Sequence, residues 1–183
     1  MQRTKLRAAP VLQAEVPPCA PAGEMDGATA SQLIRGVGHH QMDYTIRRAR
    51  AELDSTGYIE IGPGRYSGAH WQDGFLFVWE DAFGMAEGIL AKHLVDYDHF
   101  GTNDLPSEVG RRVTAEWREV AKRLCSMTAE QAHAALNLGA SYTMRLDGEV
   151  IPHQAEIAHL LTALADACDG FYEQQEWVCI LGV

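Results

Sequence analysis

Positive charge is scarce in this sequence. Its 183 residues include 15 Lys and Arg against 25 Asp and Glu, which gives a formal net charge of −10 with His neutral. Nonspecific affinity for nucleic acids comes mainly from Lys and Arg that displace counterions from phosphates, so this balance disfavours a nucleic-acid partner. It favours a protein partner with a basic surface, because oppositely charged surfaces attract one another.

Long apolar runs are also missing. No segment approaches the ~20 consecutive apolar residues that a membrane-spanning helix needs. The N-terminal region is basic at Arg3, Lys5 and Arg7, but prolines and polar residues interrupt the stretch that follows, which makes it a poor signal peptide. The sequence therefore predicts no membrane partner.

The cysteines form no C-x-x-C pair. Cys125 and Cys168 are expected on apolar faces of helices, and Cys179 lies within an apolar strand pattern. A buried thiol behaves as a small hydrophobic group. This pattern favours free thiols in a reducing compartment over a disulfide framework, so we expect the protein to be cytoplasmic.

The short motifs of several enzyme classes are absent as well. The sequence contains no G-x-S-x-G of the serine hydrolases and no dinucleotide-binding glycine pattern. Gly62-Pro63-Gly64 lacks the Lys and the following helix that a phosphate-binding loop requires. Nucleophilic and nucleotide-dependent catalysis thus have no sequence signature here.

Two regions of the chain differ in composition. Residues 1–28 are rich in Pro, Ala and Gly without any hydrophobic period, which is typical of a flexible N-terminal arm. Residues 29–183 have the hydrophobic periods of a single domain. The chain is organised around residues 75–79, the most apolar short segment before the C-terminus, which a helical pattern follows directly.

The hydrophobic periods predict an α+β fold with the element order α-βββ-ααα-ββ-α-β. The expected helices cover residues 42–53, 82–97, 106–124, 128–139 and 152–170. The expected strands cover residues 58–61, 65–71, 75–79, 141–146, 149–151 and 177–181. Clustered hairpins separated by helices predict an antiparallel or mixed sheet, with the helices packed mainly on one face.

Local signals support this order. Asp73-Gly74 is typical of a hairpin turn, and Thr128 with Gln131 has the spacing of a helix capping box. A C-terminal strand as apolar as 177–181 should be docked within the sheet, because an exposed one would invite aggregation. Left-handed glycines are expected to end three helices, at Gly57, Gly139 and Gly170.

Histidines and carboxylates before and after the segment 75–79 allow a metal site. The candidate ligands for a divalent ion such as Zn²⁺ or Mn²⁺ are His39, Asp43, His93, Asp96 and His99. Glu80 would act as the general base that activates a metal-bound water. Structural or solvated roles are the more frequent explanation of such patterns, with Asp81 capping the helix that follows.

Aromatic side chains near the 73–74 turn allow a binding surface instead. Trp71 would lie at a hairpin tip, with Tyr66 and His70 on the same strand. Exposed aromatic residues are typical of protein-binding hot spots, because they supply a large contact area at low entropic cost.

The leading hypothesis is a small, acidic, non-enzymatic protein that binds another protein without a cofactor, as an inhibitor, an immunity-like protein or an adaptor. The alternative is a metal-dependent hydrolase with Glu80 at its centre. A small-molecule pocket between sheet and helices also stays open.

Overall fold

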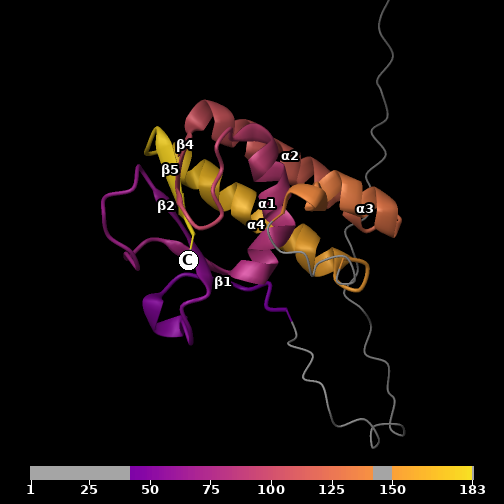
Figure 1. Cartoon of the computed structure of the whole chain (residues 1–183), viewed down its shortest axis with the longest axis horizontal. Coiled ribbons are helices and arrows are strands. Elements are labelled where there is room, and N and C mark those ends of the chain that lie inside the picture. The colour runs from indigo at the N-terminus through magenta and orange to yellow at the C-terminus, as the bar shows by residue number, and fades with distance from the viewer. Residues whose placement is uncertain (1–41, 142–149, 183) are drawn as a thin grey trace, which may run out of the picture.

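The computed structural model describes residues 42–141 and 150–182 (Figure 1). In this part of the chain, five strands form one antiparallel sheet in the order β1-β3-β2-β5-β4, together with four α-helices, so the predicted α+β class is confirmed. The strands are β1 (Ile46–Arg47), β2 (Tyr58–Pro63), β3 (Leu76–Trp79), β4 (Thr102–Pro106) and β5 (Trp177–Leu181). The helices are α1 (Glu80–His93), α2 (Ser107–Leu124), α3 (Ala129–Leu136) and α4 (Gln154–Tyr172), with short 3-10 turns η1 (Arg50–Glu52) and η2 (Leu138–Ala140).

The last strand, β5, lies inside the sheet between β2 and β4. Ile180 is opposite Ile61 of β2 on one side, and Val178 is opposite Leu105 of β4 on the other. Both edges of an apolar strand are therefore hydrogen-bonded rather than open to other chains. The prediction that the segment 177–181 is docked within the sheet is confirmed.

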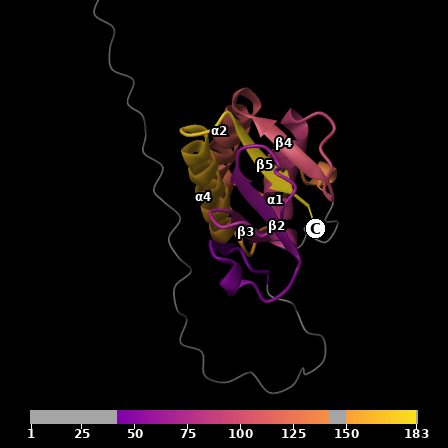
Figure 2. The same ribbon diagram turned by 90° about the vertical axis from the view of Figure 1, so that its left-hand side faces the viewer.

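The two faces of the sheet are covered differently. Ile59 and Ile61 of β2 point into the large core, which the helices cover. Tyr58 of the same strand joins Phe75 and Phe77 in a smaller cluster. Figure 1 shows the helices on one side of the sheet and the purple connections that precede β3 on the other, and Figure 2 shows β2 and β5 in front of α1. Loops, rather than helices, cover this second face.

Close packing fixes the helices to one another. Trp117 of α2 is fully buried, and its indole N–H donates to the carbonyl of Ala86 in α1 over 3.0 Å. At Gly88 of α1, an added Cβ would lie 2.3 Å from the carbonyl oxygen of Asn137, which follows α3. Glycine is therefore needed at Gly88 for the close approach of the two helices.

The first predicted helix does not form. Residues 42–45 are irregular, Ile46–Arg47 pairs with β3, and η1 follows. Side chains bind nearby backbone N–H groups in this segment, since Asp43 accepts from the N–H of Thr45 and Glu52 from that of Arg48. The partly buried residues Met42, Tyr44 and Ile46 are two apart, which is the period of a strand.

The predicted strand at 65–71 is also wrong, because this segment is a loop, which is described below with the site. The expected loop at 98–103 is present only at 98–101, because β4 begins at Thr102, with Asn103 and Leu105 buried. Asp104 and Pro106 weakened the strand pattern there, although both are tolerated in an edge strand.

The predicted ends of the helices agree with the structure less closely than their predicted positions do. The capping box is confirmed, because the Thr128 hydroxyl accepts from Gln131 N and the Gln131 side chain accepts from Thr128 N. Asn137, in a left-handed conformation, ends α3 in place of Gly139. Helix α4 continues past Gly170 to Tyr172.

The remaining predictions concern segments at the limits of the described residues. The arm at 1–28 and most of the hairpin at 141–151 lie outside them, while Ser141 forms a bend and 150–151 a turn. Cys168 and Cys179 are buried free thiols, as expected. Cys125 is exposed just after α2 and is disulfide-bonded, so its predicted place on an apolar face and the expectation of a free thiol there are both wrong. In the described ranges, no helix has both the length and the apolar character to cross a membrane.

Candidate binding site

Glu60 is a buried carboxylate on the sheet face that the helices leave uncovered. It is 2% exposed and lies opposite Phe77 of β3 and Leu181 of β5. Burying a carboxylate is costly unless hydrogen bonds compensate it. The connection between β2 and β3 supplies these hydrogen bonds.

Carboxylates on the sheet hold this connection, residues 64–75, against the face. The N–H of Trp71 donates to Oε2 of Glu60 over 2.6 Å, and Oε1 of Glu60 lies 2.7 Å from Nδ1 of His70. The N–H of Tyr66 donates to Oδ1 of Asp104 in β4 over 2.9 Å. Backbone groups that a strand at 65–71 would pair with a neighbour are therefore bound to side chains of the sheet.

The loop makes these contacts through several left-handed residues. Gly64, Gly68 and Gly74 have positive φ, and so does Trp71, at 60°. A bulky residue rarely adopts this conformation, which costs of order 1–3 kcal/mol unless the surroundings stabilise it. The hydrogen bond from Trp71 N to buried Glu60 provides such stabilisation.

The three side chains expected to bind a partner lie together above Glu60. The Trp71 ring stacks on Phe77 with centroids 5.8 Å apart, and the Tyr66 and His70 rings are 5.4 Å apart. Tyr66 and Trp71 are half-buried, while the His70 side chain is 44% exposed. The residues predicted from the sequence are thus neighbours at the surface, although on a loop rather than a strand.

Sequence reasoning missed Glu60, the residue that organises this site. A signal was present, because Glu60 is the single charged residue in the otherwise apolar strand pattern of β2. A carboxylate flanked by Ile59 and Ile61 within a buried strand requires a partner. The sequence does not show which part of the chain supplies it.

A pocket of about 410 Å³ opens beside the loop. Its walls are formed by β2 and the residue Thr56 before it, by the 64–75 loop, by the start of β4 with the residues that precede it, and by the residue that follows β5. Among the described residues, these walls contain neither Lys nor Arg. The lining residues are Thr56, Glu60, His70, Trp71, Phe100, Gly101, Thr102 and Gly182. Phe100 is 53% exposed, so an apolar ring lies at the surface next to the pocket.

A second buried network lies at the N-terminal half of α1. His99 is buried between two carboxylates, with Nδ1 2.5 Å from Oε1 of Glu87 and Nε2 2.9 Å from Oε1 of Glu80. Glu87 also accepts hydrogen bonds from the hydroxyls of Tyr97 and Ser141, each over 2.9 Å. The network joins α1 to the connection that leads into β4.

The pKa values in this network follow from burial and charge. Burial alone would lower the pKa of His99, but hydrogen bonds to Glu80 and Glu87 outweigh burial and raise it. Burial, together with the charge of Glu87, raises the pKa of Tyr97 well above its ordinary range. His99 is therefore stabilised as a cation that donates from both ring nitrogens.

Two other predicted metal ligands have partners of their own. Oδ2 of Asp43 accepts from Arg47 over 2.8 Å, and Nε2 of His93 lies 2.6 Å from Oε2 of Glu116 in α2. Asp96 is exposed in a left-handed conformation. Burial would raise the pKa of Asp43, but hydrogen bonds from Thr45 and Arg47 lower it.

The structure therefore brings Glu80 and His99 together, while Asp43 and His93 lie in separate contacts. His39 falls outside the described residues. Across 42–141 and 150–182, no group of three or more His, Cys, Asp or Glu side chains is arranged to hold a metal ion.

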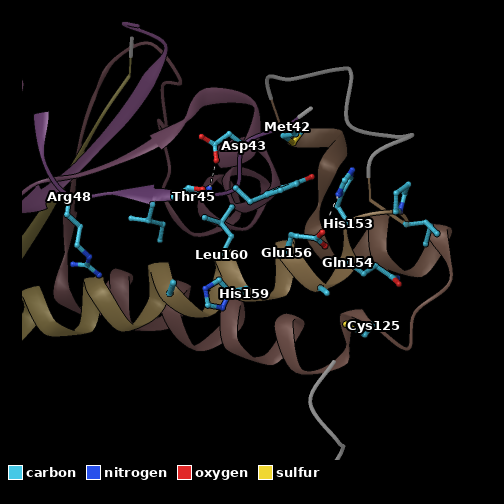
Figure 3. Close-up of a pocket in the computed structure, with 16 residues that line it drawn as sticks. Met42, Asp43, Thr45, Arg48, Cys125, His153, Gln154, Glu156, His159 and Leu160 are labelled. Carbon is cyan, nitrogen blue, oxygen red and sulfur yellow. Dashed lines mark hydrogen bonds and ion pairs between the residues drawn. The ribbon is translucent and has the colours of Figure 1, made fainter. Parts of the chain in front are cut away.

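Asp43 lines a larger pocket, of about 1180 Å³, between residues 42–48 and α4 (Figure 3). Figure 3 shows His153, Glu156 and His159 on the α4 side of this pocket. Its charged side chains include Asp43, Arg48 and Glu156, so they have both signs and favour no one ligand charge.

Comparisons with known proteins identify no relative. Protein families, curated proteins and solved structures all give no match to this chain.

Proposed function

We propose that this protein acts by binding another protein, one with a basic surface, and that it does so through the 64–75 loop. The binding surface consists of Tyr66, His70 and Trp71 of the loop with Phe100 beside them, and we call it the loop face. The observation that carries the proposal is buried Glu60, which fixes the loop so that these side chains are neighbours at the surface.

Preorganisation supports this function. The loop is held at Tyr66 and at 70–71 by carboxylates of two strands, so little conformational entropy remains to be lost when a partner docks. Aromatic residues in such a setting are typical of the few positions that carry most of the binding energy. The strained backbone of Trp71 agrees with a functional role, because strain of this kind tends to cluster at functional sites.

Charge supports the choice of partner. The chain has a formal net charge of −10, which attracts a basic surface and speeds its encounter. Inhibitors and immunity-like proteins that mask a basic site of an enzyme fit this chemistry, and so do adaptors.

The hydrolase alternative has less support from the geometry. Its candidate ligands are His39, Asp43, His93, Asp96 and His99. Of these, Asp43, His93 and His99 contact Arg47, Glu116 and the Glu80–Glu87 pair instead of one another. Glu80 as a general base would have to leave its contact with His99. Binding through the loop face requires no such rearrangement.

Site-directed photocrosslinking in the source cells tests the proposal. A benzophenone amino acid would replace Asp73, an exposed residue of the loop, or Glu119, an exposed residue of α2 that serves as control. We expect a basic protein to cross-link at position 73 and not at 119, and we expect that protein, once identified and purified, to bind the wild type. Equal cross-linking at both positions, or no binding by the purified protein, would overturn the proposal.

A further inference from the structure

We propose that the pocket beside the loop face receives a guanidinium group, the side chain of an arginine in the partner, with Glu60 as its counter-ion. This inference rests on the proposed function and adds the chemistry that the loop face recognises. Three features carry it: an ionisable group at the wall, aromatic surfaces around it, and the size of the space.

The first feature is the hydrogen-bonding capacity of Glu60. An ionised carboxylate offers about four acceptor positions, and the loop uses one on each oxygen, through His70 and Trp71. The ion pair of Glu60 in the described part of the chain is with His70, while the pocket wall contains no Lys or Arg. Each oxygen of Glu60 therefore keeps an acceptor position beyond the one that the loop uses.

The second feature is the aromatic lining. Trp71 and Phe100 belong to the same pocket, and both rings can attract a cation through their faces. Rings of this chain already accept guanidinium groups, because Arg65 lies 3.7 Å from the centre of the Trp177 ring and Arg47 lies 5.0 Å from that of Tyr58. A planar guanidinium can both stack on such rings and donate to a carboxylate. An ammonium group donates well to a carboxylate but has no planar face to stack on a ring.

The third feature is the space itself. At about 410 Å³, the pocket falls within the roughly 300–1,000 Å³ typical of ligand sites. It opens next to exposed Phe100 and His70, so a side chain projecting from a protein docked on the loop face can enter it. A neutral group there would bring no charge opposite to that of Glu60, and an acidic group would repel it.

N-butylguanidinium is the probe that tests this inference, with neutral N-butylurea as its matched control. Proton–nitrogen NMR spectra of the full chain would follow the Trp71 indole and the His70 imidazole during titration. We expect shifts that saturate with N-butylguanidinium and are absent with N-butylurea. In Glu60→Gln, which keeps the shape but loses the charge, we expect the affinity to fall about tenfold or more, as for other buried charge pairs.

A second pair of variants keeps the test informative should Glu60→Gln fail to fold. Phe100 and Val95 are both exposed apolar residues of the connection between α1 and β4, at 53% and 84% exposure, but only Phe100 lines the pocket. Phe100→Ala should weaken N-butylguanidinium binding severalfold, while Val95→Ala should leave it unchanged. Equal responses to the two probes, or equal losses in the two alanine variants, would overturn the inference.

The two proposals fail in different ways. Should the cross-linked protein bind the wild type while N-butylguanidinium does not, the guanidinium pocket is wrong and the loop face stands. Should N-butylguanidinium bind through Glu60 while no protein cross-links at position 73, the pocket stands and the proposed protein partner is wrong.

Discussion

Oε1 of Glu60 lies 2.7 Å from Nδ1 of His70, which joins a buried carboxylate of the central strand β2 to an exposed ring of the 64–75 loop. The neighbouring Oε2 accepts from Trp71 N over 2.6 Å. One side chain therefore fixes two consecutive loop residues. Glu60 therefore fixes His70 and Trp71 of the loop face, while Asp104 holds Tyr66.

Glu60→Ala should loosen the loop. The change removes both hydrogen bonds to His70 and Trp71, so we expect the free energy of unfolding to fall by about 1–3 kcal/mol in urea titrations. Trypsin should also cut the native protein faster after Arg65, an exposed residue at the start of the loop. Glu119→Ala, an exposed change on α2, should alter neither quantity. Unchanged cleavage in Glu60→Ala would show that Glu60 does not hold the loop.

Stability should depend on pH through His99. Its pKa is raised in the folded protein, so the stabilising contribution is fully present below the ordinary pKa of 6.5 and is lost as pH rises through the higher folded value. The wild type should therefore lose about 1–3 kcal/mol relative to His99→Gln between mildly acidic and alkaline pH, as the ion pairs with Glu80 and Glu87 disappear. Urea unfolding over this range measures the difference. Parallel pH profiles for the two proteins would contradict the assignment.

Two glycine substitutions in helices should act in opposite directions. Gly88→Ala would place a Cβ 2.3 Å from the Asn137 carbonyl oxygen, so we expect a loss of about 1–3 kcal/mol from overpacking. Gly170→Ala in α4 meets no atom within 4 Å and should stabilise the protein by about 0.5–1 kcal/mol, because alanine restricts the unfolded chain. Thermal melts of both variants check this pair. A stable Gly88→Ala would mean that α1 and α3 pack less closely than described.

The two buried thiols should resist alkylation. Burial raises the pKa of Cys168 to about 12 and that of Cys179 to about 11, so almost no thiolate is present at neutral pH. Peptide mass spectrometry after iodoacetamide treatment should find both residues unmodified in the native protein and modified in denaturant. Rapid native labelling of Cys179 would indicate that β5 is not enclosed between β2 and β4.

The sequence predicts those parts of the fold whose own residues determine the structure. Continuous apolar runs identified β3 and β5, and the Thr128–Gln131 pair identified the start of α3. The predictions for 42–53 and 65–71 were wrong because the conformation of each segment depends on contacts with distant parts of the chain. The first segment pairs with β3, and the second donates hydrogen bonds to Glu60 and Asp104. Local periodicity contains no information on such partners.

The candidate site was predictable to the same extent. Tyr66, His70 and Trp71 could be selected because aromatic residues near a turn are unusual unless they bind or pack. The anchor of His70 and Trp71 could not, since Glu60 and His70 become neighbours only when the loop folds back onto β2. The predicted metal ligands illustrate the converse. Helical spacing suggested that His39 and Asp43 share a helix face, but Asp43 lies in an irregular segment and His39 lies outside the described residues.

The affinity of the cross-linked partner for Tyr66→Ala tests the central claim most directly. Tyr66 is held through its backbone N–H, which the substitution retains, so the loop should keep its shape while the face loses one aromatic ring. Isothermal titration should show an affinity about tenfold or more below that of the wild type, and Glu119→Ala should bind like the wild type. Equal affinities for all three proteins would contradict binding through the loop face.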